Sequence, residues 1–295
     1  MSSRRGLSAV ELCGQSDLSR SVDVAAQCVV VKPLHANLFE ITFHAPELAL
    51  RAAPGEFAEL LVAEGPLPLL RRPLSFSRAD PTAGTVSFYL GAVGEGSRRL
   101  ARFHPGDELR ILGPLGRGFS LPETPGRSLL LSGGLGAAPF PLLAEWLLAR
   151  GEEVAWLDGA RTKPELYPQE FFPPGVERLP AFTEDGSSGR RGRVIDELGA
   201  SGQGVQRLYA CGPNPMLAAV ARLWSELHPK GGPRLEVSIE APMGCGFGTC
   251  LGCAIPILGP GAELGPLGLC CRQGPVLESS QLDWERLLGQ PSHLA

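Results

Sequence analysis

Short apolar runs separated by turn residues dominate the chain between about residues 22 and 122. These runs are rich in β-branched and aromatic residues, and turn signals such as Pro54-Gly55 and Pro105-Gly106-Asp107 separate them. The clearest runs are 28–31, 37–43, 57–62 and 85–90. Several short strands at this spacing predict an antiparallel β-barrel over 22–122. Residues 1–21 contain no apolar run, and we expect a flexible tail there rather than a secretory signal.

The pattern changes after Pro125, where strands begin to alternate with helices. Continuous apolar runs predict buried strands at 128–131, 154–157 and 207–211. Helices are expected over 140–150 and from about 215 to 227. This alternation predicts a doubly wound parallel sheet, an α/β nucleotide-type domain over 123–232. Residues 233–295 are rich in glycine and cysteine, and they predict a third, smaller module.

Composition and charge exclude several classes of protein. Of the 295 residues, 43% are hydrophobic and 20% are charged, as in globular proteins. The net charge of −4 argues against binding nucleic acid through the phosphate backbone. Residues 128–149 are long enough to cross a bilayer, but their glycines and prolines favour a strand, a turn and a helix. Eight cysteines without a signal peptide indicate a reducing, cytoplasmic compartment and metal or redox chemistry.

Cysteines near the C-terminus carry the strongest chemical signal. Cys245, Cys250 and Cys253 follow the C-x4-C-x2-C spacing of plant-type [2Fe–2S] proteins. Such a cluster needs four thiolates, and the spacing leaves the fourth ligand open between Cys270 and Cys271. Glycines in the loop would let the backbone approach the sulfurs. A structural zinc site is the alternative, although zinc modules more often pair two C-x2-C units.

Two turns of the predicted parallel sheet are candidates for binding a dinucleotide. The first follows a buried strand, and its candidate residues are Gly133, Gly134, Gly136 and Pro139. Glycines there let a pyrophosphate approach a helix N-terminus, although the order is not G-x-G-x-x-G and tight strand–helix packing would also explain them. The second turn ends a later strand and contains Cys211, Gly212, Pro213 and Met216. Because ligands of open parallel sheets bind at the carboxyl ends of the strands, we expect both turns to share one edge.

The predicted barrel carries two candidate phosphate-binding segments. Arg71-Arg72-Pro73-Leu74-Ser75 offers an arginine fork, and Gly94-Glu95-Gly96-Ser97 offers backbone N–H groups and a hydroxyl. In isolation, both segments would be interpreted as ordinary strand and turn residues.

Taken together, these motifs resemble those of the ferredoxin–NADP reductase superfamily and, within it, the electron-transfer subunits of class 1B dihydroorotate dehydrogenases. The likeness covers about residues 24–280. The matching segments are Arg72-Pro73-Leu74-Ser75, Gly94-Glu95-Gly96-Ser97, Leu112-Gly113-Pro114-Leu115-Gly116, Thr183-Glu184-Asp185-Gly186-Ser187, Cys211-Gly212-Pro213 with Met216, and Cys271-Arg272-Gln273-Gly274-Pro275-Val276. The family's C-x-x-G-P-V register implies Cys271 as the fourth ligand. The sequence departs from the family at Ser97, where threonine is usual, and in a slightly longer span from Cys253 to Cys271.

The resemblance implies a fold and three cofactors. The fold would be a ferredoxin-reductase-like, FAD-binding antiparallel β-barrel, an NAD-binding α/β domain and a small C-terminal [2Fe–2S] module. The implied FAD residues are Arg72, Pro73, Leu74, Ser75, Tyr89, Leu90, Gly91, Gly96 and Ser97. NAD(H), a diffusible co-substrate, would be bound by Gly133, Gly134, Gly136, Pro139, Cys211, Gly212, Pro213 and Met216. The cluster would be held by Cys245, Cys250, Cys253 and Cys271.

The implied function is an electron relay in pyrimidine biosynthesis. Electrons would pass between NAD and an FMN-containing dihydroorotate dehydrogenase catalytic subunit, through FAD and the cluster. The implied assembly is a heterotetramer of two catalytic and two electron-transfer subunits, and no residue here is expected to act on dihydroorotate itself. One alternative is another FAD/[2Fe–2S] relay subunit, of the sulfhydrogenase gamma or transhydrogenase small subunit type. The other is a non-enzymatic adaptor with a zinc knot.

Overall fold

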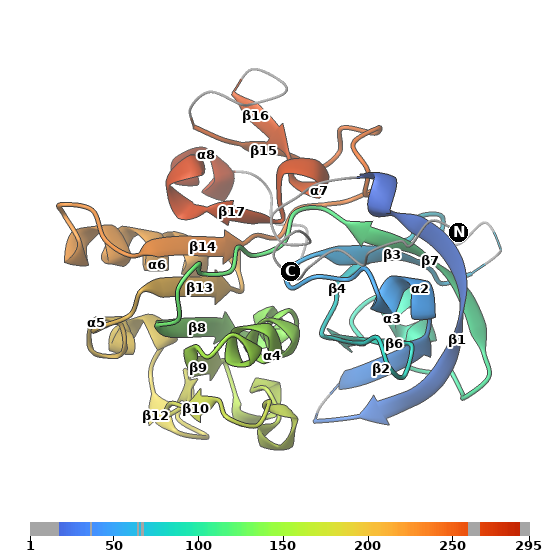
Figure 1. Cartoon of the computed structure of the whole chain (residues 1–295), viewed down its shortest axis with the longest axis horizontal. Helices are drawn as coiled ribbons and strands as arrows, with labels where there is room; N and C mark the ends of the chain where they lie inside the picture. Colours follow the sequence, from blue (N-terminus) through green and yellow to red (C-terminus); the bar gives the residue numbers. More distant parts are fainter. Residues whose placement is uncertain (1–17, 36, 64, 66–67, 259–265, 290–295) are drawn as a thin grey trace.

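Two sheets lie side by side in the computed structural model, and the cysteine-rich C-terminal segment packs where they meet (Figure 1). The structure describes residues 18–289 except 36, 64, 66–67 and 259–265. Residues 1–17 of the expected flexible tail therefore lie outside the described residues. Its last residues include a short 3-10 helix, η1 (Leu18–Arg20).

The N-terminal part forms a curled antiparallel sheet, as its alternating apolar runs predicted. In sheet order its strands are β4 (Arg72–Ser75), β3 (Phe57–Leu61), β7 (Glu108–Leu115), β1 (Val22–Pro33), β2 (Leu38–His44), β6 (Thr85–Gly91) and β5 (Arg78–Asp80). Every pairing along this path is antiparallel. The path ends at β4 and β5, which have four and three residues, so the described sheet is a half-barrel and not a closed ring. Two short helices flank it, α2 (Pro46–Ala49) and α3 (Glu95–Leu100).

The middle part forms a mostly parallel sheet, which confirms the doubly wound architecture. In sheet order its strands are β12 (Arg190–Arg191), β11 (Phe182–Thr183), β9 (Glu153–Ala160), β8 (Arg127–Gly133), β13 (Arg207–Cys211), β14 (Arg234–Ser238) and β17 (Val276–Glu278), with β10 (Glu177–Arg178) beside β9. Only β17 pairs antiparallel, with β14. Its helical elements are η2 (Gly134–Ala137), α4 (Phe140–Ala149), η3 (Lys163–Glu165), η4 (Gln169–Phe171), η5 (Val194–Glu197), α5 (Leu198–Ser201) and α6 (Asn214–Leu227).

Burial on both faces explains the continuous apolar runs of this sheet. Successive side chains of a strand point to opposite faces. Along β8, Leu130 packs in the cluster that contains α4, whereas Leu129 and Leu131 pack in the cluster that contains α6. The expected helices over 140–150 and 215–227 are confirmed as α4 and α6, which cover these two faces.

The cysteine-rich segment joins both sheets through residues 274–276. It contains a two-stranded ribbon, β15 (Ala254–Pro256) and β16 (Leu267–Leu269), followed by α7 (Cys270–Gln273), β17, η6 (Ser279–Gln281) and α8 (Trp284–Leu288). The Gly274 carbonyl accepts from the N–H of Arg117, which directly follows the half-barrel, and the Val276 N–H donates to the Arg117 carbonyl. The Pro275 carbonyl accepts from the N–H of Ile239, next to β14. Both β14 and β17 lie beyond residue 232 in the sequence.

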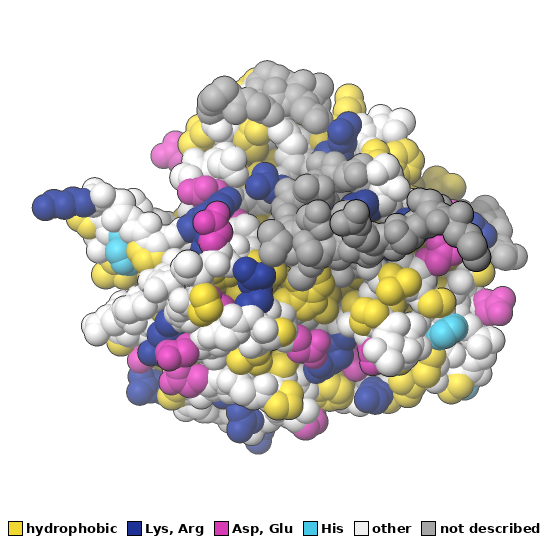
Figure 2. Space-filling view, in the orientation of Figure 1, with side chains coloured by type: hydrophobic (Ala, Val, Ile, Leu, Met, Phe, Trp, Pro, Cys, Tyr) yellow, Lys and Arg dark blue, Asp and Glu magenta, His cyan; other side chains and the backbone are white. Residues whose placement is uncertain are grey.

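Charged side chains of both signs are mixed on one face of the molecule. On the face shown in Figure 2, Lys and Arg side chains lie among Asp and Glu side chains and do not form one broad basic field. Among the described residues, no helix combines the length and the apolar character needed to cross a bilayer.

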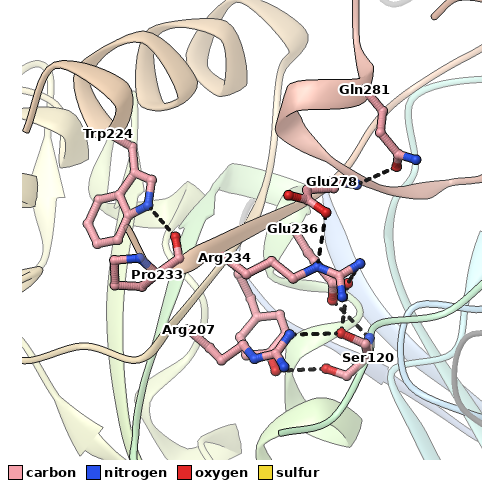
Figure 3. Close-up of polar contacts among 9 residues, drawn as sticks. Ser120, Arg207, Trp224, Pro233, Arg234, Glu236, Glu278 and Gln281 are labelled. Atoms are coloured by element: carbon pink, nitrogen blue, oxygen red, sulfur yellow. Dashed lines mark hydrogen bonds and ion pairs between the residues drawn. The ribbon is translucent and has the colours of Figure 1, made fainter. Parts of the chain in front are cut away.

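A buried polar network fixes the segment that links the two sheets (Figure 3). Glu236 on β14 is 3% exposed, and its carboxylate accepts from the backbone N–H and the hydroxyl of Ser120, each at 2.8 Å. The same carboxylate forms an ion pair with Arg234 at 3.1 Å. On the neighbouring strand β13, Arg207 donates to the Ser120 hydroxyl and the Tyr209 hydroxyl donates to the Ser120 carbonyl. The segment around Ser120, which links the two sheets, is therefore hydrogen-bonded to both β13 and β14.

A second buried carboxyl, Asp158, lies near the end of β9, beside the first glycine turn. It accepts hydrogen bonds from the Ser132 hydroxyl (2.5 Å) and from the Tyr167 backbone N–H (2.8 Å). Burial raises the pKa of Asp158 to about 7, although these hydrogen bonds act to lower it.

Replacing Glu236 with alanine is expected to destabilise the protein by about 3 kcal/mol. The substitution leaves the Ser120 N–H and the Arg234 guanidinium without their buried acceptor. Urea denaturation of wild type and variant measures the free energy of unfolding. The matched control is Glu177→Ala, which breaks an exposed ion pair with Arg127 and should change stability by less than about 0.5 kcal/mol. Equal losses for both variants would contradict the proposed importance of the network.

Replacing Asp158 with asparagine is expected to weaken the dependence of stability on pH. Because folding raises the pKa of this carboxyl, its contribution to stability is complete below the unfolded-state value of 3.8 and is lost as the pH rises to about 7. The melting temperature of the wild type should therefore fall more steeply than that of Asp158→Asn between about pH 5 and pH 7. Thermal melts across this range provide the measurement, and parallel curves would show that this carboxyl does not titrate there.

Candidate cofactor sites

The two arginine- and glycine-rich segments of the half-barrel come together in space. Arg72 lies on β4, and Gly96 lies in the first turn of α3. A Cβ atom on Gly96 would stand 2.5 Å from Arg72 Nε, so glycine allows this close approach. Arg72 Nε is buried and has no hydrogen-bond partner among the described residues. The Ser97 hydroxyl bonds to the backbone of Gly94 and fixes the turn. An anion would find both a donor and a preformed turn here.

The side chains of the other expected flavin residues point in different directions. Leu90 is buried in the core of the half-barrel, and the half-buried Leu74 packs against that core. Tyr89 points the opposite way, and its ring packs edge-on against Tyr167 of the middle part at 5.2 Å. The Tyr89 hydroxyl is buried and has no partner within the described part of the chain, and burial raises its pKa. Gly91, at the end of β6, lies close to Leu135 in the glycine turn.

The two turns of the parallel sheet interlock at one edge, as the sequence predicted. β8 and β13 are adjacent and parallel, with Ser132 in register with Cys211. A Cβ atom on Gly136 would stand 2.2 Å from the Cys211 carbonyl oxygen, and one on Gly133 would stand 2.5 Å from Met216 Sδ. Glycine is therefore required for this packing itself. Gly134 adds a left-handed backbone with φ +55°.

Other residues of this edge complete its surface. Pro139 directly precedes α4, and Pro213 directly precedes α6, so that both helices begin at the shared edge. Burial raises the pKa of the Cys211 thiol to about 12, and the neighbouring carboxylate of Glu240 adds to the effect. Burial thus favours the neutral form of the Cys211 thiol.

The four expected cluster cysteines fall into two pairs. The Cys250 N–H points at Cys245 Sγ, and the Cys271 N–H points at Cys253 Sγ, each at 3.5 Å. Cys253 Sγ and Cys271 Sγ lie 3.2 Å apart. The hydrogen bond from Cys271 lowers the pKa of Cys253 to about 6. In the described part of the chain, no three Cys, His, Asp or Glu side chains form one group around a single metal ion. Two thiol pairs match the donor set of a two-iron cluster, which takes two thiolates at each iron.

Cys270 and Cys271 share the same surroundings but differ in what their sulfurs contact. Both thiols are buried in the same apolar cluster, and both pKa values are raised. Cys271 Sγ lies 3.2 Å from Cys253 Sγ, whereas Cys270 Sγ lies beside Gly274. The contact with Cys253 favours Cys271 as the partner of the loop cysteines. The cysteine loop itself turns sharply, with left-handed backbone at Gly246, Gly248 and Leu251.

One residue of the candidate site gave no motif signal. Glu59 on β3 is fully buried, and among the residues that the structure describes neither of its carboxyl oxygens has a hydrogen-bond partner. Burial raises the pKa of Glu59 to about 8, and the thiols of Cys245 and Cys253 act in the same direction. A Cβ atom on Gly246 would stand 2.7 Å from Glu59 Cγ, so the cysteine loop rests directly on β3. The only signal in the sequence was a single acidic residue in the apolar run 57–61.

Contact with Glu59 places the cysteine loop beside Arg72–Ser75 on β4, which we call the flavin segment. Glu59 is in register with Pro73 on the adjacent strand β4, which also carries Arg72. The three candidate sites therefore follow one another in space. The cysteine loop touches β3, β3 pairs with β4, and the end of β6 meets the glycine turn through Gly91 and Leu135.

Comparisons with known proteins agree with this arrangement. The family model for the iron–sulfur cluster binding domain of dihydroorotate dehydrogenase B matches residues 240–283. A protein of Bacillus caldolyticus named dihydroorotate dehydrogenase B (NAD(+)), electron transfer subunit, is 38% identical over 261 residues, 88% of this chain and 96% of that protein. A protein of the same name from Geobacillus thermodenitrificans is 37% identical over 246 residues, 83% of this chain and 92% of that protein.

A solved structure is similar over almost the whole chain. It is the NADH-dependent reduced ferredoxin–NADP oxidoreductase, studied for flavin-based electron bifurcation, and it has a TM-score of 0.75 at 26% identity. The match covers 90% of this chain and 91% of that chain. The resemblance seen in the sequence motifs is thus confirmed, and the chain belongs to the family of electron transfer subunits of dihydroorotate dehydrogenase B.

Proposed function

We propose that this chain transfers electrons between NAD(H) and a separate dihydroorotate dehydrogenase catalytic subunit. The observation that carries the proposal is the unbroken contact from the glycine turn through the half-barrel to the cysteine loop. The curated relatives at 37% and 38% identity bear this function in their names. They favour it over other relay subunits of the same architecture.

Each part of the chain is assigned one cofactor. The half-barrel, residues 22–122, would hold FAD, with Arg72 and the turn at Gly96 and Ser97 taking its phosphates. The α/β part, 123–232, would take NAD(H) at the edge formed by Gly133, Gly134, Gly136, Pro139, Cys211, Gly212, Pro213 and Met216. The module over 233–295 would hold a [2Fe–2S] cluster through Cys245, Cys250, Cys253 and Cys271.

The residues of the chain position these groups, whereas the electron chemistry belongs to the cofactors. A flavin exchanges two electrons with a nicotinamide and single electrons with an iron–sulfur cluster. Gly133 and Gly136 let the two turns pack closely, because side chains there would meet Met216 or the Cys211 carbonyl, and this packing holds together the edge at which a dinucleotide would bind. The N–H groups of the cysteine loop aim at sulfur, which favours the thiolate form.

The partner is proposed to dock on the apolar face around the cysteine loop. Large apolar side chains there are exposed: Leu69 and Leu70 before β4, and Phe247 and Leu251 in the loop. A Cβ atom on Gly244 would stand 4.0 Å from Leu70 Cδ1, so Leu70 lies beside the cysteine loop that carries Phe247 and Leu251. Exposed apolar patches of this kind are typical of protein interfaces. We assign the surface to an FMN-containing catalytic subunit, in an assembly of two catalytic and two electron-transfer subunits.

Anaerobic addition of NADH to the purified chain should bleach its flavin absorption. Addition of the catalytic subunit should then give dihydroorotate-dependent reduction of NAD+, which we expect the isolated chain not to catalyse because the proposal assigns the dihydroorotate site to the catalytic subunit. Visible spectroscopy follows both steps. A flavin that NADH does not reduce, or a colourless protein that contains zinc, would refute the proposal.

Replacing Cys271 with serine should abolish the cluster, whereas Cys270→Ser should retain it. The Cys271 thiol faces Cys253, and the Cys270 thiol lies in the apolar core. Iron and acid-labile sulfide analysis, together with electron paramagnetic resonance of the reduced protein, measures cluster content. The two variants are matched controls for each other. The opposite result would identify Cys270 as the ligand.

A further inference from the structure

Arg78 makes polar contacts with both halves of the molecule. It lies on β5, at the edge of the half-barrel, and its Nε is 3.7 Å from a carboxylate oxygen of Glu40 on β2. Its Nη1 is 2.6 Å from Glu145 Oε1 on α4, and its Nη2 donates to the Phe171 carbonyl in η4. A single guanidinium thus holds one group of the antiparallel sheet and two groups of the α/β part.

The two elements that Arg78 joins are continuations of the two candidate cofactor segments. β5 follows β4, which carries Arg72, with only Phe76 and Ser77 between them. α4 directly follows the glycine turn and Pro139. A displacement of α4 relative to β5 would therefore also move the dinucleotide edge relative to the flavin segment.

Glu40 is nearly buried, whereas Arg78 and Glu145 are partly exposed, so solvent screens these ion pairs only in part. The Glu40 side chain is 6% exposed, and those of Arg78 and Glu145 are 29% and 39% exposed. Burial raises the pKa values of Glu40 and Glu145, whereas the charge of Arg78 lowers both. Apart from Arg78, Lys32 is the positive group that acts on Glu40, and Asp80 adds negative charge near Glu145.

Other contacts across this junction have less directional preference. Lys32 Nζ lies 5.6 Å from the centre of the Phe171 ring, and the Tyr89 and Tyr167 rings meet edge to face. Such contacts tolerate small displacements, whereas a guanidinium bonded to two acceptors at once fixes direction as well as distance.

We propose that Arg78 is a positioning residue that fixes α4 and the glycine turn against the flavin segment, and thereby sets the alignment of bound NAD(H) with FAD. This inference rests on the proposed function. Transfer between bound partners requires reacting atoms about 3–3.5 Å apart, and a misplacement of about 1 Å can reduce the rate by about 100-fold. Arg78 touches neither reacting group and acts through α4.

Stopped-flow reduction of the bound flavin by NADH, under anaerobic conditions, tests this role. The concentration dependence separates the limiting rate of reduction from the dissociation constant for NADH. We expect Arg78→Gln to lower the limiting rate at least tenfold and to change the dissociation constant less than threefold. The matched control is Arg190→Gln, which breaks an ion pair with Glu197 inside the α/β part and should behave as wild type.

A second variant removes the same contact from the other side. Glu145→Gln leaves Arg78 and Glu40 paired within the half-barrel. It therefore tests the contact between β5 and α4 even if Arg78→Gln does not fold. It should lower the limiting rate in the same way, by a smaller factor, because the bond to the Phe171 carbonyl remains.

The outcomes distinguish this inference from the proposed function. A wild-type flavin that NADH does not reduce would refute the proposed function. If NADH reduces the wild type, and both variants keep its limiting rate or change only the dissociation constant, the positioning role of Arg78 is overturned. A lower limiting rate in both variants, with the control unchanged, supports it.

Discussion

The hydrogen bonds made by residues 274–276 are the constraint on which the arrangement of the molecule depends. This short stretch bonds to Arg117 at the exit of the half-barrel and to Ile239 at the end of β14, and it continues into β17. Since Cys271 lies just before it, the same backbone that joins the two sheets also anchors one sulfur of the cysteine site. The position of the cysteine site relative to the two sheets therefore depends on backbone hydrogen bonds between segments far apart in the sequence, which act together with the side-chain contacts of Ser120 and Arg78.

Much of the fold was predictable because local patterns and tertiary contacts agree. The apolar runs gave the antiparallel strands, and the alternation of strand and helix gave the parallel sheet with α4 and α6 on its two faces. β17 was not predictable. Its three residues carry no periodicity, and it forms a strand only because the edge of β14 offers unpaired backbone groups. Similarly, the apolar runs do not define the lengths of β4 and β5, the short strands at the two ends of the half-barrel. They therefore did not predict that the sheet stays open between these strands.

The candidate sites were predictable where chemistry imposes spacing. Cysteine spacing and glycine turns are such cases, because ligand geometry and close backbone approach limit which residues can occupy those positions. Glu59 and Arg78 lie outside any motif, since their roles arise from burial and from neighbours on other elements. Side-chain direction was also beyond the sequence. Tyr89 and Leu90 are adjacent, yet one faces the middle part and the other the core of the half-barrel.

The placement of the cysteines has a consequence for how metal binding affects the molecule. Three of the sulfurs belong to a loop that rests on β3 through Gly246, whereas Cys271 belongs to a segment already fastened to the parallel sheet. A cluster bound by all four is therefore a cross-link between a loop and a rigid frame. Without the cluster, the backbone hydrogen bond from the Cys270 N–H to the Cys253 carbonyl would still tie the end of the loop to that segment, and the two sheets would keep the bonds that join them. The cluster would therefore add a second attachment, through Cys245 and Cys250, to a loop that already contacts its surroundings at β3 and at Cys253.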